Sequence, residues 1–364
     1  MTRAKRVAAE MRAKGLEAMV ITHPADVRWV SGFTGSNAAV ALVGGRGRLF
    51  TDGRYTAQAK EEVQGLAVTI ATKPVAQEAC AWLEKAGARI CGFDSAVTSV
   101  AALEAMKTAI SGKTRRGFFR AAPGIVSRLR EVKDDVEIGA MRRAALLGCR
   151  VYDEMLGVIE AGMTEIEVAA ELEYRARKAG AEAMSFDTIV ASGVRGSLPH
   201  VRATGKRLAR GEMVTLDFGV ILGGYCSDMT RTVYLNRSAR FSPLEAEQKR
   251  AFDAVSEAQI AAVSAVRSGV SCAEVDEAAR GFLRAAGFEK EFSHSTGHGV
   301  GLEIQDSPRV GAKQAQKLEP GMVITIEPGV YVAGKYGIRI EDTVLVMEKG
   351  CEVLTPSVKS WMEL

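Results

Sequence analysis

Two stretches of this sequence, GEMVTLDFGV at residues 211–220 and GMVITIEPGV at residues 321–330, are related to one another. Aligned without gaps at a separation of 110 positions, they share a glycine, a threonine, an acidic residue and a Gly-Val pair. The alignment matches Asp217 with Glu327, and each acid stands in an otherwise apolar strand pattern. The chain therefore carries an internal duplication that repeats a strand with an acid in it.

A second pair of related segments lies upstream at almost the same separation. GMTEIEV at residues 162–168 and GVSCAEV at residues 269–275 are 107 positions apart. Each contains a capping box, a pattern that opens an amphipathic helix, and the two boxes are Thr164 with Glu167 and Ser271 with Glu274. We therefore expect two half-domains, each of helices followed by strands, packed about a pseudo-two-fold axis.

Composition sets broad limits on the class of protein. The chain has 364 residues, of which 47% are hydrophobic and 25% charged, with a net charge of +4; this is typical of one large or two ordinary globular domains. No stretch is apolar and long enough to predict a membrane span. No Lys/Arg face with interleaved aromatics predicts a nucleic-acid partner. The six scattered cysteines form no CxxC pair, which favours reduced thiols and a cytoplasmic location.

The first third of the chain has a different organisation from the duplicated part. Short apolar runs alternate with helical patterns, which predicts a small α/β domain. Strands are expected at 17–21, 38–43 and 48–51, and helices at 54–64 and 76–87. The Pro-Gly break in AAPGIVSRLREVKDD precedes a long helix near 134–160. We therefore expect two domains, residues 1–125 and 126–364, and an α+β fold overall.

Pairs of carboxylates are expected to face one another across hairpins. In the ILGG hairpin, a turn centred between Leu222 and Gly223 would set Asp217 directly opposite Asp228. Directly opposed residues share one face of a sheet with Cβ atoms ~4.5–5.5 Å apart. Two carboxylates at that distance destabilise the fold unless one is protonated or a cation lies between them.

The second copy repeats this arrangement. Glu327 and Glu341 are symmetric about Gly334, in the loop VAGKYG. The pseudo-two-fold would bring both pairs of acids to one axis, in apolar surroundings where unpaired charges are costly. A pair of exposed, solvated acids is the alternative for either hairpin alone. The repetition of both pairs favours a site for two divalent metal ions.

An imidazole ligand is available in HSTGHGVGLEIQDSP, residues 294–308. This stretch holds two of the four histidines in the chain, His294 and His298. Only one of them needs to bind metal. Glu does not follow His294, so the HExxH zinc motif is absent, and the glycines do not form a GxxxxGK[ST] phosphate loop.

These motifs resemble those of the pita-bread metallopeptidases. The resemblance is carried by LDFGVILGGYCSDMTRTVYL, HSTGHGVGLE, TIEPGVY and GIRIEDTVLV, in the family's order. GFTGSNAAV and TDGRYTAQA look like the creatinase-type N-terminal domain of the proline-specific branch, the Xaa-Pro aminopeptidases and prolidases. The resemblance implies a C-terminal pita-bread fold, with duplicated half-domains around a curved antiparallel sheet. It also implies a smaller N-terminal creatinase-like α/β domain.

The resemblance implies a complete set of metal ligands. The five matching positions are Asp217, Asp228, His298, Glu327 and Glu341. The metal-free creatinases lose these carboxylates, whereas this chain keeps them. The implied cofactor is two divalent ions, with Mn²⁺ first and Co²⁺ or Zn²⁺ as alternatives. Such a pair activates water for attack on the scissile carbonyl, and Glu327 would also transfer the proton.

Further site residues follow from the same resemblance. His200, in SLPH, matches a histidine that contacts substrate, and Arg339 matches an arginine beside the metals. A structural partner for a ligand carboxylate is the alternative role for Arg339. His294 is expected in a hydrogen-bonding or packing role at the substrate pocket, which Tyr331 would also line. Thr230, on the strand face of Asp228, is expected to brace that carboxylate.

One catalytic position departs from the family pattern. The family has a histidine seven residues after the histidine ligand, in a VHE or VHD element, whereas this chain reads IQD and has Gln305. Glutamine can donate a hydrogen bond to substrate, but it cannot carry a proton or a positive charge. A working but weaker or altered catalyst is expected.

The leading functional hypothesis is an Xaa-Pro aminopeptidase, a dinuclear metal-dependent peptidase that hydrolyses the N-terminal Xaa-Pro bond. The expected partner is a peptide with proline at its second position, and a homodimer is expected from the resemblance. An Xaa-Pro dipeptidase (prolidase) is the first alternative. Gln305 favours a second, the hydrolysis of a small non-peptide amide. A non-catalytic binding protein is a third, which retention of all five ligands opposes.

Overall fold

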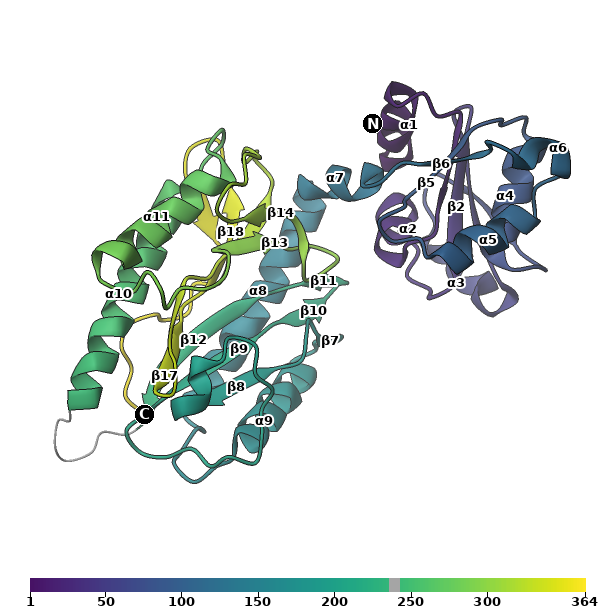
Figure 1. Cartoon of the computed structure of the whole chain (residues 1–364). Helices are drawn as coiled ribbons and strands as arrows, with labels where there is room; N and C mark the ends of the chain where they lie inside the picture. Colours follow the sequence, from purple (N-terminus) through teal and green to yellow (C-terminus); the bar gives the residue numbers. More distant parts are fainter. Residues whose placement is uncertain (236–242) are drawn as a thin grey trace. The chain divides into compact units, whose positions relative to one another are not determined.

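The computed structural model describes residues 1–235 and 243–364, and these divide into two compact units, Met1–Arg130 and Glu131–Leu364. Figure 1 shows the chain coloured along the sequence, with the elements labelled. No helix among the described residues is both long and apolar enough to cross a membrane. All six cysteines are free, and five are buried.

The two compact units meet between Arg130 and Glu131, within helix α7 (Ile125–Glu131), and the boundary predicted from the sequence lies at the start of the same helix. Arg130, near the end of α7, makes a buried contact within the first unit. Its guanidinium forms a buried ion pair with Asp26 on α2 (Pro24–Ser31), with Nη1 and Oδ1 2.7 Å apart. This pair ties most of α7 to the first unit.

The first unit is the expected α/β domain. Its six-stranded mixed sheet has the strand order β4 (Ala67–Ile70), β3 (Arg46–Thr51), β2 (Ala38–Val43), β1 (Ala18–Ile21), β5 (Cys91–Phe93) and β6 (Phe119–Ala121). Helices α1 and α2 lie on one side of this sheet and α4 and α5 on the other (Figure 1). Besides α2 and α7, its helices are α1 (Arg3–Ala13), α3 (Thr56–Glu62), α4 (Val75–Lys85), α5 (Val100–Thr108) and α6 (Gly112–Arg115), with a 3₁₀ turn at Gly53–Tyr55.

The second unit contains both copies of the duplication. The first copy comprises α8 (Asp135–Met155), α9 (Glu165–Lys178), β7 (Ala183–Met184), β8 (Ile189–Ser192), the 3₁₀ helix η2 (Gly193–Ser197), β9 (Glu212–Phe218), β10 (Val220–Leu222), β11 (Tyr225–Cys226) and β12 (Met229–Leu235). The second comprises α10 (Pro243–Ala265), α11 (Cys272–Ala285), β13 (Gly297–Gly299), β14 (Asp306–Val310), β15 (Val323–Ile326), β16 (Gly329–Val332), β17 (Tyr336–Arg339), β18 (Asp342–Val346) and β19 (Cys351–Val353).

Each half-domain buries its helices against its own strands. Leu172 of α9 packs in one apolar cluster with Leu216 of β9, and Val275 of α11 packs in another with Ile324 of β15. In Figure 1 the two helix pairs cover opposite ends of the strand layer. Both predicted capping boxes are present and begin α9 and α11. The half-domains expected from the repeat are therefore confirmed.

The expected register of the first hairpin was wrong by one residue at the turn. Leu222 pairs with Tyr225, so the turn residues are Gly223 and Gly224. Both have positive φ, 61° and 77°, which glycine adopts without strain. As a result Asp217 pairs with Thr230 in the β9–β12 ladder, and Asp228 lies just before β12.

The expected register of the second hairpin is confirmed. Gly329 pairs with Arg339, and Ile326 with Asp342, so Glu327 and Glu341 are symmetric about Gly334 between the two ladders. The two half-domains then join directly at the acids. The N–H of Glu341 donates to the carbonyl of Thr230 at 3.1 Å.

A buried ion pair reinforces this junction. The guanidinium of Arg231 on β12 is 2% exposed and pairs with the fully buried Asp342 on β18 at 2.9 Å. It also donates to the carbonyls of Thr355 and Ser357. Asp342 in turn accepts from Gln259 on α10. This network links strands of both half-domains with the chain after β19.

Substituting Asp342→Ala should lower the free energy of unfolding by about 3–5 kcal/mol, because it leaves Arg231 buried without its carboxylate. Glu352→Ala is the matched control, since its exposed pair with Arg142 should contribute about 1 kcal/mol or less. Urea denaturation of the metal-free proteins measures both. Equal losses in the two variants would contradict the role given to the buried pair.

Candidate metal centre and active site

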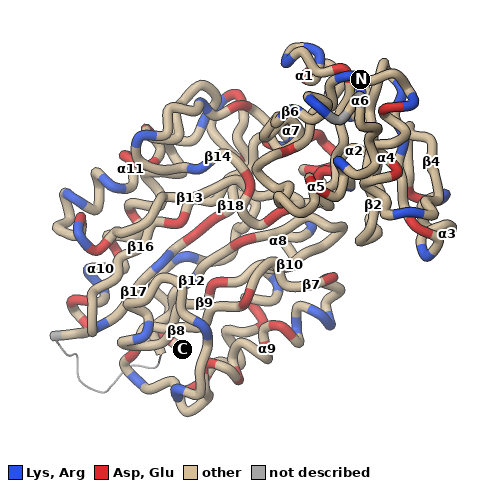
Figure 2. The backbone as a smooth tube through the Cα atoms, turned by 45° about the vertical axis from the view of Figure 1, so that its right-hand side comes forward, with Lys and Arg blue, Asp and Glu red and all other residues tan. Residues whose placement is uncertain are grey.

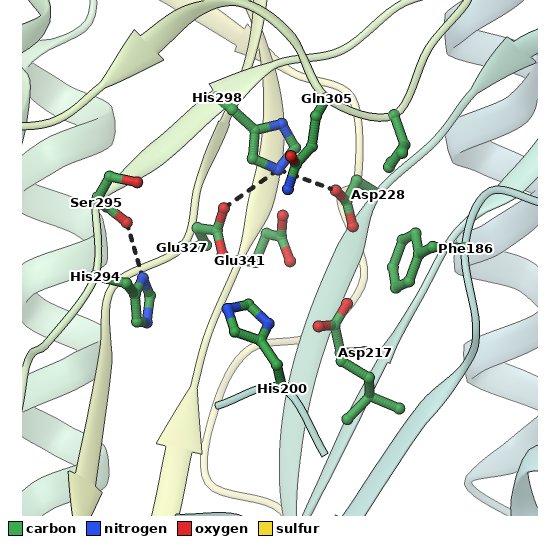
Figure 3. A pocket seen from close by; sticks show the side chains of 12 residues that line it. Phe186, His200, Asp217, Asp228, His294, Ser295, His298, Gln305, Glu327 and Glu341 are labelled. Carbon is green, nitrogen blue, oxygen red and sulfur yellow. Dashed lines mark hydrogen bonds and ion pairs between the residues drawn. The ribbon is translucent and has the colours of Figure 1, made fainter. Parts of the chain in front are cut away.

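A pocket of about 290 Å³ lies in the second unit, between strands of both half-domains (Figure 3). Twelve of the described residues line this pocket; eight of them were predicted from the sequence and four were not. The predicted residues are His200, Asp217, Asp228, His294, His298, Gln305, Glu327 and Glu341. Arg339 and Tyr331 lie buried behind the carboxylates.

Three carboxylates converge at the floor of the pocket. One oxygen each of Asp217, Asp228 and Glu341 lies within 4.8 Å of the others, and the residues are 8%, 4% and 2% exposed. Burial, and then the neighbouring charges of Glu341, Asp217 and Glu327, raise the pKa of Asp228 well above its usual range. Burial and the charges of Glu327 and Asp217 likewise raise the pKa of Glu341. A divalent cation would remove this repulsion, so the donor set fits metal.

A glycine of the repeat allows two of these acids to approach. Gly219 stands between Asp217 and Asp228 in the hairpin, and a Cβ there would lie 1.8 Å from the carbonyl oxygen of Ser227. Any larger residue would therefore push apart the backbone segments that carry the two acids. In the first copy of the repeat, the shared glycine is therefore required by the close approach of the Ser227 carbonyl.

His298 presents one ring nitrogen to the carboxylates. Its Nδ1 lies 3.0 Å from the carbonyl oxygen of Gly299, which assigns the proton to Nδ1. In the neutral ring the lone pair is then on Nε2, which lies 3.7 Å from Asp228 and 3.5 Å from Glu327 (Figure 3). A backbone carbonyl that fixes the outer nitrogen is the usual arrangement for a histidine that binds metal.

Glu327 is held by a threonine of the repeat. Thr325 Oγ1 donates to its carboxylate at 3.1 Å and accepts from the N–H of His298 at 3.0 Å. Burial raises the pKa of Glu327 to about 7; Arg339 opposes this rise and Asp217 adds to it. In the metal-free protein this carboxyl group therefore binds a proton more readily than an ordinary glutamate.

Arg339 is the buried partner of a carboxylate, the alternative role considered for it. Its side chain is 3% exposed, and Nη2 forms an ion pair with Asp217. Nη1 donates to the hydroxyl of Tyr331 at 2.6 Å, and Nε to Thr230 at 3.2 Å. Figure 2 shows acidic and basic segments gathered among the strands of this unit. One buried positive charge offsets only part of the negative charge of the acids.

Thr230 braces a different carboxylate from the one expected. Its hydroxyl donates to Glu341 at 2.6 Å, not to Asp228. The cause is the register, since Thr230 is the residue opposite Asp217 and its backbone bonds to Glu341.

His294 and Tyr331 form a hydrogen-bonded pair at the pocket wall. Nδ1 of His294 lies 2.8 Å from the carbonyl of Ser295, and Nε2 lies 2.9 Å from the hydroxyl of Tyr331. Burial lowers the pKa of His294 to about 4 and raises that of Tyr331 to about 12. His294 is therefore neutral at pH 7, with its Nε2 accepting from Tyr331.

The two remaining predicted residues come from loops. His200 follows η2 and is exposed, and Gln305 immediately precedes β14 and is exposed. Both side chains line the pocket, Gln305 beside His298 and His200 on the other side of the carboxylates, near Asp217 (Figure 3).

Sequence reasoning missed the apolar wall of the pocket. Its residues are Phe186, Ile189 and Ile304, with Ser295 beside them. Ile189 pairs with Asp217 across β8 and β9, so it shares the face of that acid. The strand pattern of DTIVASG was the available signal, but its partner strand was not identifiable from sequence.

Comparison with known proteins agrees with this arrangement. Residues 139–348 match metallopeptidase family M24, and residues 3–132 match the creatinase/prolidase N-terminal domain. The chain therefore belongs to metallopeptidase family M24, in its pita-bread fold with a creatinase-type N-terminal domain. This confirms the resemblance drawn from the sequence motifs.

Three similar proteins bear on specificity. An Xaa-Pro dipeptidase of Pyrococcus furiosus is 41% identical over 237 residues, which cover 65% of this chain and 66% of that protein. The structure of an Xaa-Pro dipeptidase from Bacillus anthracis has a TM-score of 0.94 at 34% identity, covering 100% of this chain and 99% of that one. The structure of an X-Pro aminopeptidase from Thermotoga maritima has a TM-score of 0.88 at 34% identity, covering 100% of both chains.

Metal should stabilise this protein by relieving repulsion among the acids. We expect Mn²⁺ to raise the Tm of the chelator-treated protein. At a Mn²⁺ concentration 100 times Kd, the free energy of unfolding should increase by about 2.7 kcal/mol. Asp228→Asn should abolish this rise while leaving the stripped protein at least as stable as the unsubstituted one. Differential scanning fluorimetry measures both.

The control is Asp253→Asn, an exposed acid of α10 that should keep the full metal response. A rise in Tm that survives Asp228→Asn would place the stabilising metal elsewhere.

Proposed function

We propose that the chain is an Xaa-Pro dipeptidase, rather than the aminopeptidase that was the leading hypothesis from sequence. Similar proteins bearing the dipeptidase name support this choice. The observation that carries it is the position of Arg309. In the β13–β14 pair Arg309 is directly opposite His298, so its side chain leaves the sheet on the same face.

A dipeptide differs from a longer peptide by the carboxylate on its proline. The exposed Arg309, across the strand pair from His298, suits that group, because arginine binds carboxylates in a bidentate manner. Arg202, an exposed arginine two residues after His200, already pairs with Asp187 at 3.0 Å. Arg309 is therefore our candidate for recognising the free carboxylate.

The five predicted ligands suit two divalent ions, with Mn²⁺ preferred to Co²⁺ or Zn²⁺ because oxygen donors dominate the set. When bound, the ions would lower the pKa of water and polarise the scissile carbonyl. Asp217, Asp228 and Glu341 would hold them from the floor, and His298 from the opposite wall through Nε2. The protonated Nδ1 of His298, fixed by Gly299, keeps that lone pair available.

Glu327 would be both ligand and proton carrier. It would accept a proton from the attacking water and return it to the proline nitrogen, which must be protonated as the bond breaks. The threonine that holds its carboxylate limits its motion. Arg339 would act only through Asp217 and Tyr331, by fixing their orientation.

His200 and Gln305 would contact the substrate from the two loops. Both line the pocket, and a hydrogen bond from either to the carbonyl oxygen would grow stronger as negative charge develops there. His294 and Tyr331 would form the wall beside them. Gln305 replaces the usual histidine with a neutral side chain. This replacement favours the second candidate function, hydrolysis of a small non-peptide amide.

Hydrolysis of Ala-Pro and Ala-Pro-Ala by Mn²⁺-loaded protein tests the proposal. We expect cleavage of the dipeptide and little of the tripeptide. Efficient cleavage of the tripeptide would make the enzyme an aminopeptidase, and two bound metals without cleavage of either would favour the non-peptide amide.

Arg309→Ala should raise KM for Ala-Pro by about tenfold or more, because a charge-assisted pair contributes about 1.5–3 kcal/mol. The same substitution should hardly change the KM for Ala-Pro amide, which lacks the carboxylate. Arg202→Ala is the matched control and should leave both constants nearly unchanged. A similar loss on the amide would exclude carboxylate recognition by Arg309.

Gln305→His should raise kcat on Ala-Pro, by up to about 10²-fold, because a histidine can add a charge-assisted hydrogen bond to the developing oxyanion. Gln305→Ala, which keeps no donor, should lower it. Initial rates at saturating substrate measure both variants. A kcat for Gln305→His at or below that of the unsubstituted enzyme would show that glutamine suits this site better than the usual residue.

We also propose a homodimer in a reducing, cytoplasmic setting. The free cysteines are compatible with that compartment, and the dimer rests on the family resemblance alone.

A further inference from the structure

The loop that carries His200 is closed at its base by one buried carboxylate. Glu165, the first residue of α9, is fully buried and accepts five hydrogen bonds. At the start of the loop its Oε1 accepts from the N–H and the hydroxyl of Ser192, both at 2.9 Å. At the end of the loop its Oε2 accepts from the N–H and hydroxyl of Thr204, at 3.1 and 2.9 Å.

The fifth donor is an arginine within the loop. Arg195 Nε donates to Glu165 Oε2 at 2.9 Å, and its Nη2 reaches the carbonyl of Arg202 at 2.6 Å. The loop is thus braced across its middle as well as at its base. Its tip contacts the metal centre, since the carbonyl of Pro199, beside His200, accepts from Arg339 at 3.3 Å.

The second half-domain holds the loop that carries His294 in a similar way, through a buried carboxylate of its own. Asp276 of α11 is 1% exposed and accepts from the N–H and hydroxyl of Thr296. It pairs with Arg280 at 3.0 Å. Arg280 in turn donates to the carbonyls of His294 and Phe292, at 2.9 and 3.1 Å.

We propose that Glu165 and Asp276 are positioning residues, each of which holds one histidine-bearing loop against the substrate pocket. Neither carboxylate lines the pocket. The hydrogen bonds to each carboxylate come from N–H groups, hydroxyls and a guanidinium, so the loop geometry depends on a side chain whose two oxygens can both accept. This inference rests on the proposed function, because it assumes that His200 contacts the substrate.

The two positioning residues are not duplicates of one position. Glu165 is the residue after the N-cap of α9, and the corresponding residue of α11 is Cys272. Asp276 lies one turn further along its helix. Each of the two related helices therefore anchors a loop through a buried carboxylate, but the carboxylate stands at a different position in each helix.

Glu165→Gln is the sharpest test, since it keeps the size of the side chain but turns an NH₂ group towards at least two donors. We expect kcat/KM on Ala-Pro to fall by about tenfold to a hundredfold, as for a small misplacement of a substrate-positioning group. Metal content should not change. In a His200→Ala background the same substitution should cost about twofold or less, because the group it positions is already gone.

The matched control is a double variant in which the histidine removed lies on the other loop. Glu165→Gln combined with His294→Ala should show nearly the product of the single losses, since the two loops are held separately. A loss from Glu165→Gln that is unchanged in the His200→Ala background would overturn the proposal. Thr204→Val, which removes one donor and no charge, gives a milder variant should Glu165→Gln fold poorly.

Hydrogen exchange provides a readout that does not depend on activity. In Glu165→Gln the amides of residues 193–204 should exchange faster while those of 292–298 keep their protection, and Asp276→Asn should give the reverse. Unchanged exchange in both segments would reject the positioning role. If neither peptide is cleaved but exchange responds as expected, the loop clamps stand and the dipeptidase proposal fails.

Discussion

Electrostatic repulsion among buried carboxylates is the constraint on which the second unit depends. Three acids have oxygens within 4.8 Å of one another, and Glu327 lies beside them under the same pocket. Burial raises the pKa of several of these groups, so the metal-free arrangement costs free energy. A fold that keeps such a cluster must hold it rigidly until cations neutralise it.

The strands provide that rigidity through short-range hydrogen bonds. Thr325 holds Glu327 and Thr230 holds Glu341, each through one hydroxyl. Arg339 fixes Asp217 and also bonds to Thr230, so the carboxylates are connected through shared donors. Thr325 belongs to the repeated motif, whereas Thr230 serves the junction between the two copies.

The duplication explains why the loops at the pocket need support. Each half-domain packs its helices on its own strands, and the junction between the halves lies at the acids. His200 and His294 come from loops at this junction, whereas His298 lies on β13. Buried carboxylates at the starts of α9 and α11 supply polar anchors for the two loops.

Much of this protein was determined by sequence alone. The repeat predicted two half-domains, the capping boxes predicted where two helices begin, and symmetry about Gly334 gave the correct register of the second hairpin. The motifs also identified the acids and histidines that the pocket brings together. Such features are local, because caps, alternation and turn residues act within a few positions of one another.

Tertiary structure decided what depends on contacts between distant segments. The turn of the first hairpin lies at Gly223 and Gly224 rather than at Leu222 and Gly223, and this one-residue shift changed the expected partner of Asp217 from Asp228 to Thr230. The ion pair that joins Arg130 of α7 to Asp26, 104 positions away, is another such contact. The apolar wall, the position of Arg309 opposite His298, and the anchors of the two loops likewise follow from pairings that no local pattern specifies.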